Sequence, residues 1–215
     1  MSELVWIERP AQESTQGLLV LLHGVGANER SLAGLAAQQD ARWQVLLPRG
    51  GVTFAPDAYG WFSVQFGPQG SVIDPVQAET SRRALIDFIA VQQARLGIPP
   101  ARTIVAGFSQ GGIMSASVAL TAPQQVAGFA ILSGRILPEI ESQVPADVGT
   151  HGLRGLVMHG HRDTKLPFAL AERSVERLRH YGVAHELRAY DEGHVLSPAM
   201  QADLRRWLDA TLPQA

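Results

Sequence analysis

Short runs of consecutive apolar residues recur along this chain and limit the folds open to it. The first run, residues 18–22, reads Leu-Leu-Val-Leu-Leu and is followed by His-Gly-Val-Gly. An apolar run without alternation is typical of a strand covered on both faces, and the glycines permit a tight turn at its end. Similar runs occupy residues 43–47, 103–106, 126–132, 153–158 and 185–190.

Helical patterns separate these runs. They span residues 76–96, 111–120, 167–181 and 198–212. Strands that alternate with helices predict βαβ units, and therefore an α/β fold with a mostly parallel sheet and helices on both faces. Residues 4–8 are expected to add an antiparallel edge strand.

The chain is predicted to form one domain over residues 1–215. Its 215 residues, 46% of them hydrophobic, suffice for one large core but are tight for two. It has no internal repeat and no long linker rich in Pro, Gly or Ser. Two stretches, 50–74 and 134–152, are predicted to be irregular loops, and loops of that length commonly bind ligands. The second is too short for a large cap domain.

Charge and composition exclude several classes of function. The net charge is -2, and the 18 basic residues are scattered, which argues against nucleic-acid binding. The chain has no cysteine, so it has no disulfide, thiolate nucleophile or Cys-ligated zinc. With no signal-like segment and no spanning apolar stretch, we expect a cytoplasmic protein without stable membrane insertion. The sequence leaves the oligomeric state open, a homodimer included.

Residues 104–112 place a G-x-S-x-G motif between an apolar run and a helical pattern. In that context the serine occupies a sharp strand-to-helix turn, and the residues two positions away, Gly107 and Gly111, have to be small. The turn lifts the hydroxyl out of the sheet, and the helix N-terminus offers free N–H groups to a developing oxyanion. Ser109 is therefore predicted to be a nucleophile rather than a structural turn serine.

A serine nucleophile needs a histidine and usually a carboxylate behind it. In α/β-hydrolases with this motif, the acid follows the serine and the histidine comes last. Asp163 follows the run 153–158, and His194 follows the run 185–190. Because parallel strands end at one edge of a sheet, we expect His194 to reach Ser109 as its base, with Asp163 orienting the imidazole.

Two further groups of residues are candidates for the substrate site. The backbone amides of Gln110, next to the serine, and Val25, in the turn after the first run, are predicted to form the oxyanion hole. Trp61 and Phe62 lie with Phe66 in the stretch 50–74 and are candidates for the wall of an apolar pocket. The alternative is that Trp61 and Phe62 fill the core beneath the loop.

Other histidines support rival interpretations. His23 is expected to hold loop backbone by hydrogen bonds, and His159 to have a structural or rim role. His159, His161 and Asp163 form a His-x-His-x-Asp pattern that echoes metal-dependent hydrolases, although Thr164 stands where that motif has its next histidine. A metal-dependent hydrolase using these three residues therefore remains an alternative, as does a binding module without catalysis on the same fold.

Together these motifs resemble the phospholipase/carboxylesterase family of α/β-hydrolases, which includes bacterial carboxylesterases and acyl-protein thioesterases. The matching segments are 22–26 (Leu-His-Gly-Val-Gly), 47–50 (Leu-Pro-Arg-Gly), 60–62 (Gly-Trp-Phe), 107–112 (Gly-Phe-Ser-Gln-Gly-Gly), 159–160 with 163, and 193–194. The resemblance implies hydrolysis of a small-molecule ester or thioester through an acyl-enzyme, with no metal or other cofactor. It assigns the triad to Ser109, Asp163 and His194, and places Trp61 and Phe62 near the acyl chain.

Two departures from the family pattern lie near the site. Thr164 and Lys165 stand where the family usually has apolar residues before a proline, and Ser63 replaces a more usual aspartate. Both changes are expected to affect the choice of substrate rather than the chemistry. An open, apolar cleft favours short to medium acyl esters, while the natural substrate is not determined by the sequence.

Overall fold

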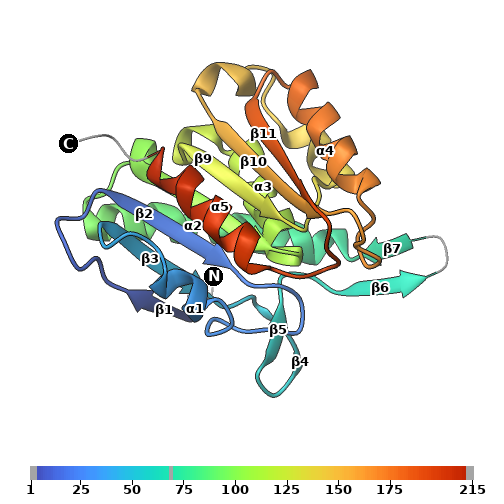
Figure 1. The fold of residues 1–215 in the computed structure, drawn as a ribbon, viewed down its shortest axis with the longest axis horizontal. Helices are drawn as coiled ribbons and strands as arrows, with labels where there is room; N and C mark the ends of the chain where they lie inside the picture. The colour runs from blue at the N-terminus through green and yellow to red at the C-terminus, as the bar shows by residue number, and fades with distance from the viewer. Residues whose placement is uncertain (1–3, 68–69, 212–215) are drawn as a thin grey trace.

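The computed structural model describes residues 4–67 and 70–211 and is built on a seven-stranded sheet (Figure 1). Six strands run parallel, and β1 pairs antiparallel with β3 at one edge. This confirms the α/β fold, the six predicted strands and the antiparallel edge strand. In spatial order, the strands are β1 (Trp6–Arg9), β3 (Trp43–Pro48), β2 (Gly17–Leu22), β8 (Thr103–Phe108), β9 (Gly128–Leu132), β10 (Arg154–Gly160) and β11 (Ala184–Tyr190).

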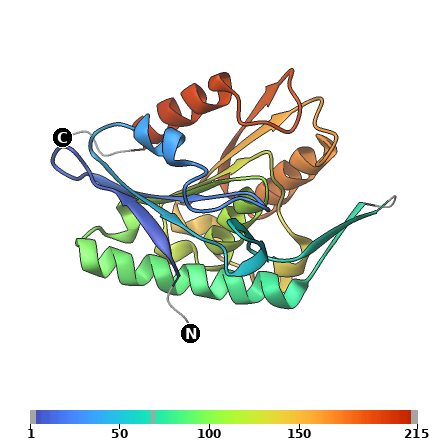
Figure 2. The ribbon, with the colours of Figure 1, turned by 90° about the horizontal axis from the view of Figure 1, so that it is seen from below.

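Helices cover both faces of the sheet, so the central strands are buried on both sides (Figure 2). One face carries α2 (Pro75–Leu96), α3 (Gln110–Thr121) and α4 (Ala169–His180), and the other carries α1 (Ala33–Ala37) and α5 (Pro198–Asp209). In β2, Leu18, Val20 and Leu22 pack toward the first group, while Leu19 and Leu21 pack toward the second. This explains why the strand sequences are continuously apolar.

Helix boundaries follow local capping chemistry. The side chain of Asp74 accepts hydrogen bonds from the N–H groups of Val76 and Gln77, and Pro75 fills the first helical position of α2. The last helix ends at Asp209, and the predicted end, Leu212, lies outside the described residues. Within the described ranges, no helix combines the length and the apolar character needed to cross a bilayer.

The stretch 50–74, predicted to be irregular, instead forms two hairpins, β4 (Val52–Ala55) with β5 (Ala58–Gly60) and β6 (Val64–Gly67) with β7 (Gly70–Ile73). These strands of three or four residues are too short to show a period of two in the sequence. The stretch 134–152 contains two short 3-10 helices, Pro138–Gln143 and Val148–His151. Two further 3-10 turns, Pro100–Arg102 and Pro123–Gln125, precede β8 and β9.

The start of α3 lies against the ends of β2 and β8 with no space for side chains between them. A Cβ atom at Gly111 would lie 2.0 Å from the carbonyl oxygen of Leu22, and one at Gly107 would lie 2.3 Å from the carbonyl carbon of Gly111. Both distances are far below van der Waals contact with backbone that cannot rotate away. The predicted need for small residues on either side of Ser109 is thus confirmed.

We predict that Gly111→Ala destabilises the protein by about 3 kcal/mol or more, since overpacking against rigid backbone forces strand and helix apart. Gly34→Ala is the matched control, because a Cβ atom there meets nothing within 4 Å. Gly34 lies in α1, so its replacement by alanine should leave the stability of the protein unchanged or raise it by about 0.5–1 kcal/mol. Urea unfolding measures both changes. Wild-type stability in Gly111→Ala would show that α3 can move away from the sheet at little cost.

Candidate active site

Ser109 occupies the turn between β8 and α3 in a backbone conformation that side chains rarely adopt. Its φ is 55° and its ψ is -117°. This combination costs about 1–3 kcal/mol and persists only where the surrounding structure imposes it. The Ser109 N–H donates a hydrogen bond of 2.8 Å to the carbonyl of Leu132 in β9. The side chain caps no helical amide, so the hydroxyl is directed to another partner.

That partner is His194, and the structure brings all three predicted triad residues together. The His194 Nε2 lies 2.9 Å from Ser109 Oγ, and its Nδ1 lies 2.6 Å from Asp163 Oδ2. Since a carboxylate oxygen only accepts, Nδ1–H is the donor, and Nε2 is left to accept the proton of the serine hydroxyl. The His194 side chain is 11% exposed and that of Asp163 is fully buried.

Asp163 is fixed on its other oxygen by backbone. Its Oδ1 accepts hydrogen bonds of 2.9 Å from Lys165 N and 2.8 Å from Leu166 N. By contrast, Asp191, close to His194 in sequence, is exposed and pairs with Arg162 at 3.0 Å. Of these two carboxylates, only that of Asp163 is directed at the His194 imidazole.

His159 lies behind Asp163 rather than at a rim, so of the two roles predicted for it the structural one is confirmed. Its side chain is fully buried, and its Nε2 lies 2.7 Å from the carbonyl of Leu166 and 3.3 Å from Asp163 Oδ2. Burial lowers the pKa of His159, so the ring is held neutral and donates from Nε2. The sequence pattern His-x-His-x-Asp offered no signal for this arrangement.

The His159, His161 and Asp163 side chains do not gather as a metal site. His161 is exposed, and its ring packs on Phe168 with a centroid distance of 4.2 Å, whereas His159 is buried in the sheet. Among the residues with described positions, no three His, Cys, Asp or Glu side chains are arranged to hold a metal ion. The residues of the metal-dependent alternative therefore do not fit a metal.

Val25 and Gln110, whose amides are the predicted oxyanion donors, both line the cavity in front of Ser109. Gln110 is the first residue of α3, so its N–H has no partner within the helix. Val25 lies in the loop after β2, with its side chain exposed. The Gln110 side chain has a second role that the sequence did not reveal: its Oε1 accepts from Trp61 N at 2.7 Å and its Nε2 donates to Phe62 O at 2.7 Å.

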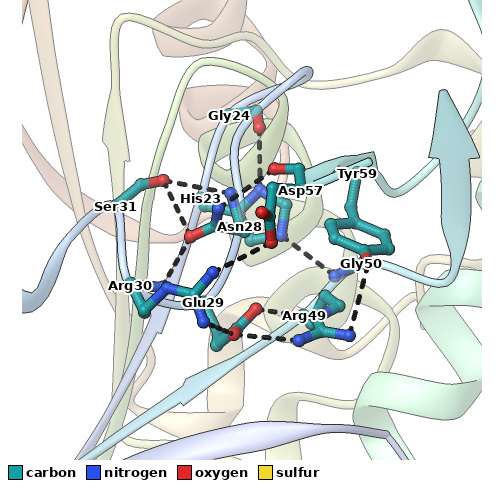
Figure 3. A network of polar contacts seen from close by, with 10 residues as sticks. All are labelled: His23, Gly24, Asn28, Glu29, Arg30, Ser31, Arg49, Gly50, Asp57 and Tyr59. Carbon is teal, nitrogen blue, oxygen red and sulfur yellow. Dashed lines mark hydrogen bonds and ion pairs between the residues drawn. The ribbon is translucent and has the colours of Figure 1, made fainter. Parts of the chain in front are cut away.

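The loop that carries Val25 is held by the buried ring of His23 (Figure 3). His23 Nε2 accepts a hydrogen bond of 3.0 Å from Gly50 N, so Nδ1–H donates to the carbonyl of Gly24 at 2.8 Å. Burial lowers the pKa of His23, which keeps the ring in this neutral form. The predicted role of His23 as a support for loop backbone is confirmed.

An ion pair between Arg49 and the buried Glu29 stabilises the part of this loop around Glu29 (Figure 3). Arg49 donates to both oxygens of Glu29, at 2.7 and 2.9 Å, and its guanidinium lies 4.5 Å from the centre of the Tyr59 ring. Glu29 is only 3% exposed. Its hydrogen bonds to Arg49 lower the pKa of Glu29 to about 2. Tyr59 also exchanges backbone hydrogen bonds with Gly26 and Ala27, each of 2.8 Å.

A cavity of about 1190 Å³ opens in front of Ser109 and His194. Phe62 lines it, as predicted, but Trp61 does not. The Trp61 ring is 0% exposed, and its Nε1 donates to the carbonyl of His23 at 2.9 Å, so it lies beneath the wall as part of the core. The Phe66 side chain lies outside the described part of the structure. Further apolar lining comes from Leu32, Leu35, Val64, Ile73, Phe108, Ile113, Leu166 and Leu196.

The two sequence departures have different positions. Thr164 and Lys165 line the cavity, whereas Ser63 is not among the residues that line it. Ser63 instead binds α2 through its backbone, because its N–H donates a hydrogen bond of 2.7 Å to Oε1 of Gln77. Of the two departures, the one at 164–165 is placed to contact a substrate.

Comparison with known proteins gives the family. A model of the Phospholipase/Carboxylesterase family matches residues 3–212. The chain belongs to this family of α/β-hydrolases. It is accordingly an esterase-type hydrolase, and the expected resemblance is confirmed.

Members of the family and solved structures resemble the chain over most of its length. It is 29% identical to acyl-protein thioesterase 1 of Eremothecium gossypii over 208 residues, which cover 90% of this chain and 87% of the relative. It is 29% identical to a rice (Oryza sativa subsp. japonica) protein described as a probable inactive carboxylesterase, over 90% of this chain and 84% of the other. The crystal structure of a Mesorhizobium loti carboxylesterase has the same fold, with a TM-score of 0.83 at 24% identity, covering 96% and 94% of the two chains.

We predict that Glu29→Gln lowers the stability of this family member by about 3 kcal/mol at neutral pH, because Arg49 is left without its buried partner. The folded-state pKa of Glu29, about 2, lies below its ordinary value of 4.5. Its contribution is therefore complete above about pH 4.5 and is lost as the pH falls from there toward about 2.

Urea unfolding of wild type and Glu29→Gln between neutral pH and about pH 3 measures this effect. The stability difference between the two should be constant at higher pH and shrink on acidification. Glu176→Gln, an exposed change on α4, is the matched control and should behave as wild type. A difference that grows as the pH falls would contradict the assignment.

Proposed function

We propose that this hydrolase cleaves carboxylic esters, with thioesters as a second substrate class, by nucleophilic attack of Ser109. The observation that carries the proposal is the continuous hydrogen-bonded chain from Asp163 through His194 to Ser109, facing a cavity. Serine is a weak nucleophile at its ordinary pKa, and an adjacent, correctly oriented imidazole is what activates it.

The proposed reaction has two halves. His194 Nε2 takes the Ser109 proton as Oγ attacks the substrate carbonyl, and then gives that proton to the departing alcohol or thiol. The acyl-enzyme is hydrolysed by a water that His194 deprotonates in the same way, which releases the acid and restores Ser109. Asp163 does not change protonation, because its task is to hold Nδ1–H and leave Nε2 as the acceptor.

The amides of Val25 and Gln110 are proposed to stabilise the oxyanion. Donors fixed in advance are effective because they need no rearrangement when charge develops. Two features support this role. His23 and the Glu29–Arg49 pair hold the loop that carries Val25, and Gln110 lies at the start of α3.

The substrate is proposed to be a small-molecule ester with a short to medium acyl chain. The cavity of about 1190 Å³ has mainly apolar walls, and Phe62 and Phe108 are among the residues that line it. The Phe108 ring also packs on His194, with a centroid distance of 5.1 Å. Thioester cleavage follows from the same geometry, since only the leaving atom changes.

We predict that Ser109→Ala lowers kcat/KM for p-nitrophenyl acetate and butyrate by about 10⁴-fold or more, because the nucleophile is lost while the fold is retained. Ser63→Ala, a nearby serine that does not line the cavity, is the matched control and should keep wild-type activity. EDTA should have no effect, and a fluorophosphonate probe should label only proteins that retain Ser109.

Other outcomes assign the function differently. Activity that disappears with EDTA but survives Ser109→Ala would return the chemistry to His159, His161 and Asp163. No activity and no labelling would favour a binding module without catalysis on the same fold.

A second prediction separates the acid from its neighbours. Asp163→Asn should lower kcat by about 10⁴-fold, because an amide at this position favours the wrong imidazole tautomer. Asp191→Asn, an exposed change three residues from His194, should leave kcat unchanged. Circular dichroism of both variants checks that they fold. Equal losses in the two variants would remove Asp163 from its proposed role.

A further inference from the structure

Two cations line the cavity in front of Ser109, and no carboxylate does so among the described residues. The cations are Arg135, in the loop after β9, and Lys165, the only lysine of the chain. Neither side chain takes part in the hydrogen-bonded chain of Ser109, His194 and Asp163, although the backbone N–H of Lys165 donates to Asp163. The remaining lining is apolar or uncharged, apart from His194.

Arg135 is the more informative of the two because it is partly buried and unpaired. Its Nε is buried and has no hydrogen-bond partner, and no carboxylate lies within 4 Å of its guanidinium in the part of the chain that the structure describes. Burial lowers the pKa of Arg135 by more than the charge of Glu139, which forms no ion pair with it, raises it. Partly desolvated cations are normally paired.

The other arginines of comparable burial in the described ranges all have partners. Arg49 binds Glu29, and Arg82 binds Glu79. The nearby Arg177 lies 3.7 Å from Glu141. The rest are Arg9, which donates to three backbone carbonyls, Arg42, which pairs with Asp40, and Arg188, which pairs with Glu186. Arg135 is the exception, and it is the one that lines the cavity.

The backbone around Arg135 is fixed against the Ser109 turn. A Cβ atom at Gly134 would lie 2.9 Å from the Ser109 carbonyl oxygen, so the backbone segments at Gly134 and Ser109 are in contact. On one side, Ser133 N donates to the carbonyl of Met158 at 2.8 Å, and on the other, Ile136 N donates to Ser174 Oγ in α4 at 3.0 Å. The backbone that carries Arg135 is therefore anchored next to the nucleophile.

We infer that the cavity takes esters that carry an anionic group, a carboxylate or a phosphate, and that Arg135 binds this group with Lys165 adding charge from the rim. The guanidinium fork matches the two oxygens of either anion. The apolar side chains of Phe62, Val64 and Ile73 line the same cavity and suit the carbon chain of such a substrate. This inference rests on the proposed ester hydrolysis and names the substrate class for it.

The experiment compares charged esters with neutral isosteres of equal length. Monomethyl esters of four- to eight-carbon dicarboxylic acids are set against methyl esters of the corresponding monocarboxylic acids. Acetate esters of ω-hydroxy acids and of ω-hydroxyalkyl phosphates place the anion on the alcohol side and separate carboxylate from phosphate. Wild type should favour at least one charged series by about 10- to 100-fold in kcat/KM, mainly through KM.

The variants assign that preference to Arg135. Arg135→Met should abolish the preference by lowering kcat/KM for the charged esters to the value for the neutral ones. Its folding stability should be unchanged or improved, because a partly buried, unpaired charge is removed. Lys165→Met should reduce the preference by about two- to five-fold. Arg173→Met, an exposed change on α4 outside the cavity, is the control and should retain it. Equal rates for charged and neutral esters in wild type would overturn the inference.

A binding measurement distinguishes failure of this inference from failure of the proposed function. Calorimetry on Ser109→Ala should detect monomethyl adipate or its phosphate counterpart, and binding should be absent in Ser109→Ala/Arg135→Met. Binding without turnover in wild type would support anion recognition and reject the serine chemistry. Hydrolysis of neutral esters with no anion binding would support the chemistry and reject the role of Arg135.

Discussion

The absence of side-chain space between α3 and the ends of β2 and β8 is the constraint on which the site depends. Because Gly111 touches the Leu22 carbonyl and Gly107 touches Gly111, the chain has to reverse within one residue, and that residue is Ser109. The strained φ of 55° follows from this contact rather than from any preference of serine. The same contact places Gln110, the first residue of α3, beside the loop after β2, and these two segments are the ones proposed to supply the oxyanion donors.

The rest of the site is a set of loops that need support from below, and buried polar groups supply it. His23 and His159 are both neutral, desolvated rings that bind backbone carbonyls, one under the Val25 loop and one behind Asp163. The neutrality of His159 matters because a second positive charge near Asp163 would compete with His194 for it. The Glu29–Arg49 pair and the Gln110 side chain hold neighbouring turns in the same way.

The features that the sequence predicted correctly are those with a local signal. Continuous apolar runs mark strands buried on both faces, and the residues that follow them, such as Ser109, Asp163 and His194, reach one sheet edge by topology alone. Features set by contacts between distant segments were missed or misplaced. Nothing in the sequence around Trp61 indicates that its indole N–H donates to the His23 carbonyl. Likewise, nothing around His159 indicates that its ring lies against Asp163. The hairpins of residues 52–73 were missed because their strands are too short to show a period.

Arg135 belongs to this second class, and its case shows why substrate choice is harder to predict from sequence than chemistry. The reaction requires residue types at fixed places relative to strand ends, so its signature survives in short motifs. Recognition requires only that some side chain of suitable charge reaches the cavity, and many loop positions can provide one. What distinguishes Arg135 from the other arginines is a property of its surroundings: it is partly desolvated, it lacks a partner in the described chain, and its backbone is anchored at the Ser109 turn. A cation on an anchored backbone segment, without an internal partner, is placed to pair with a ligand that supplies the opposite charge.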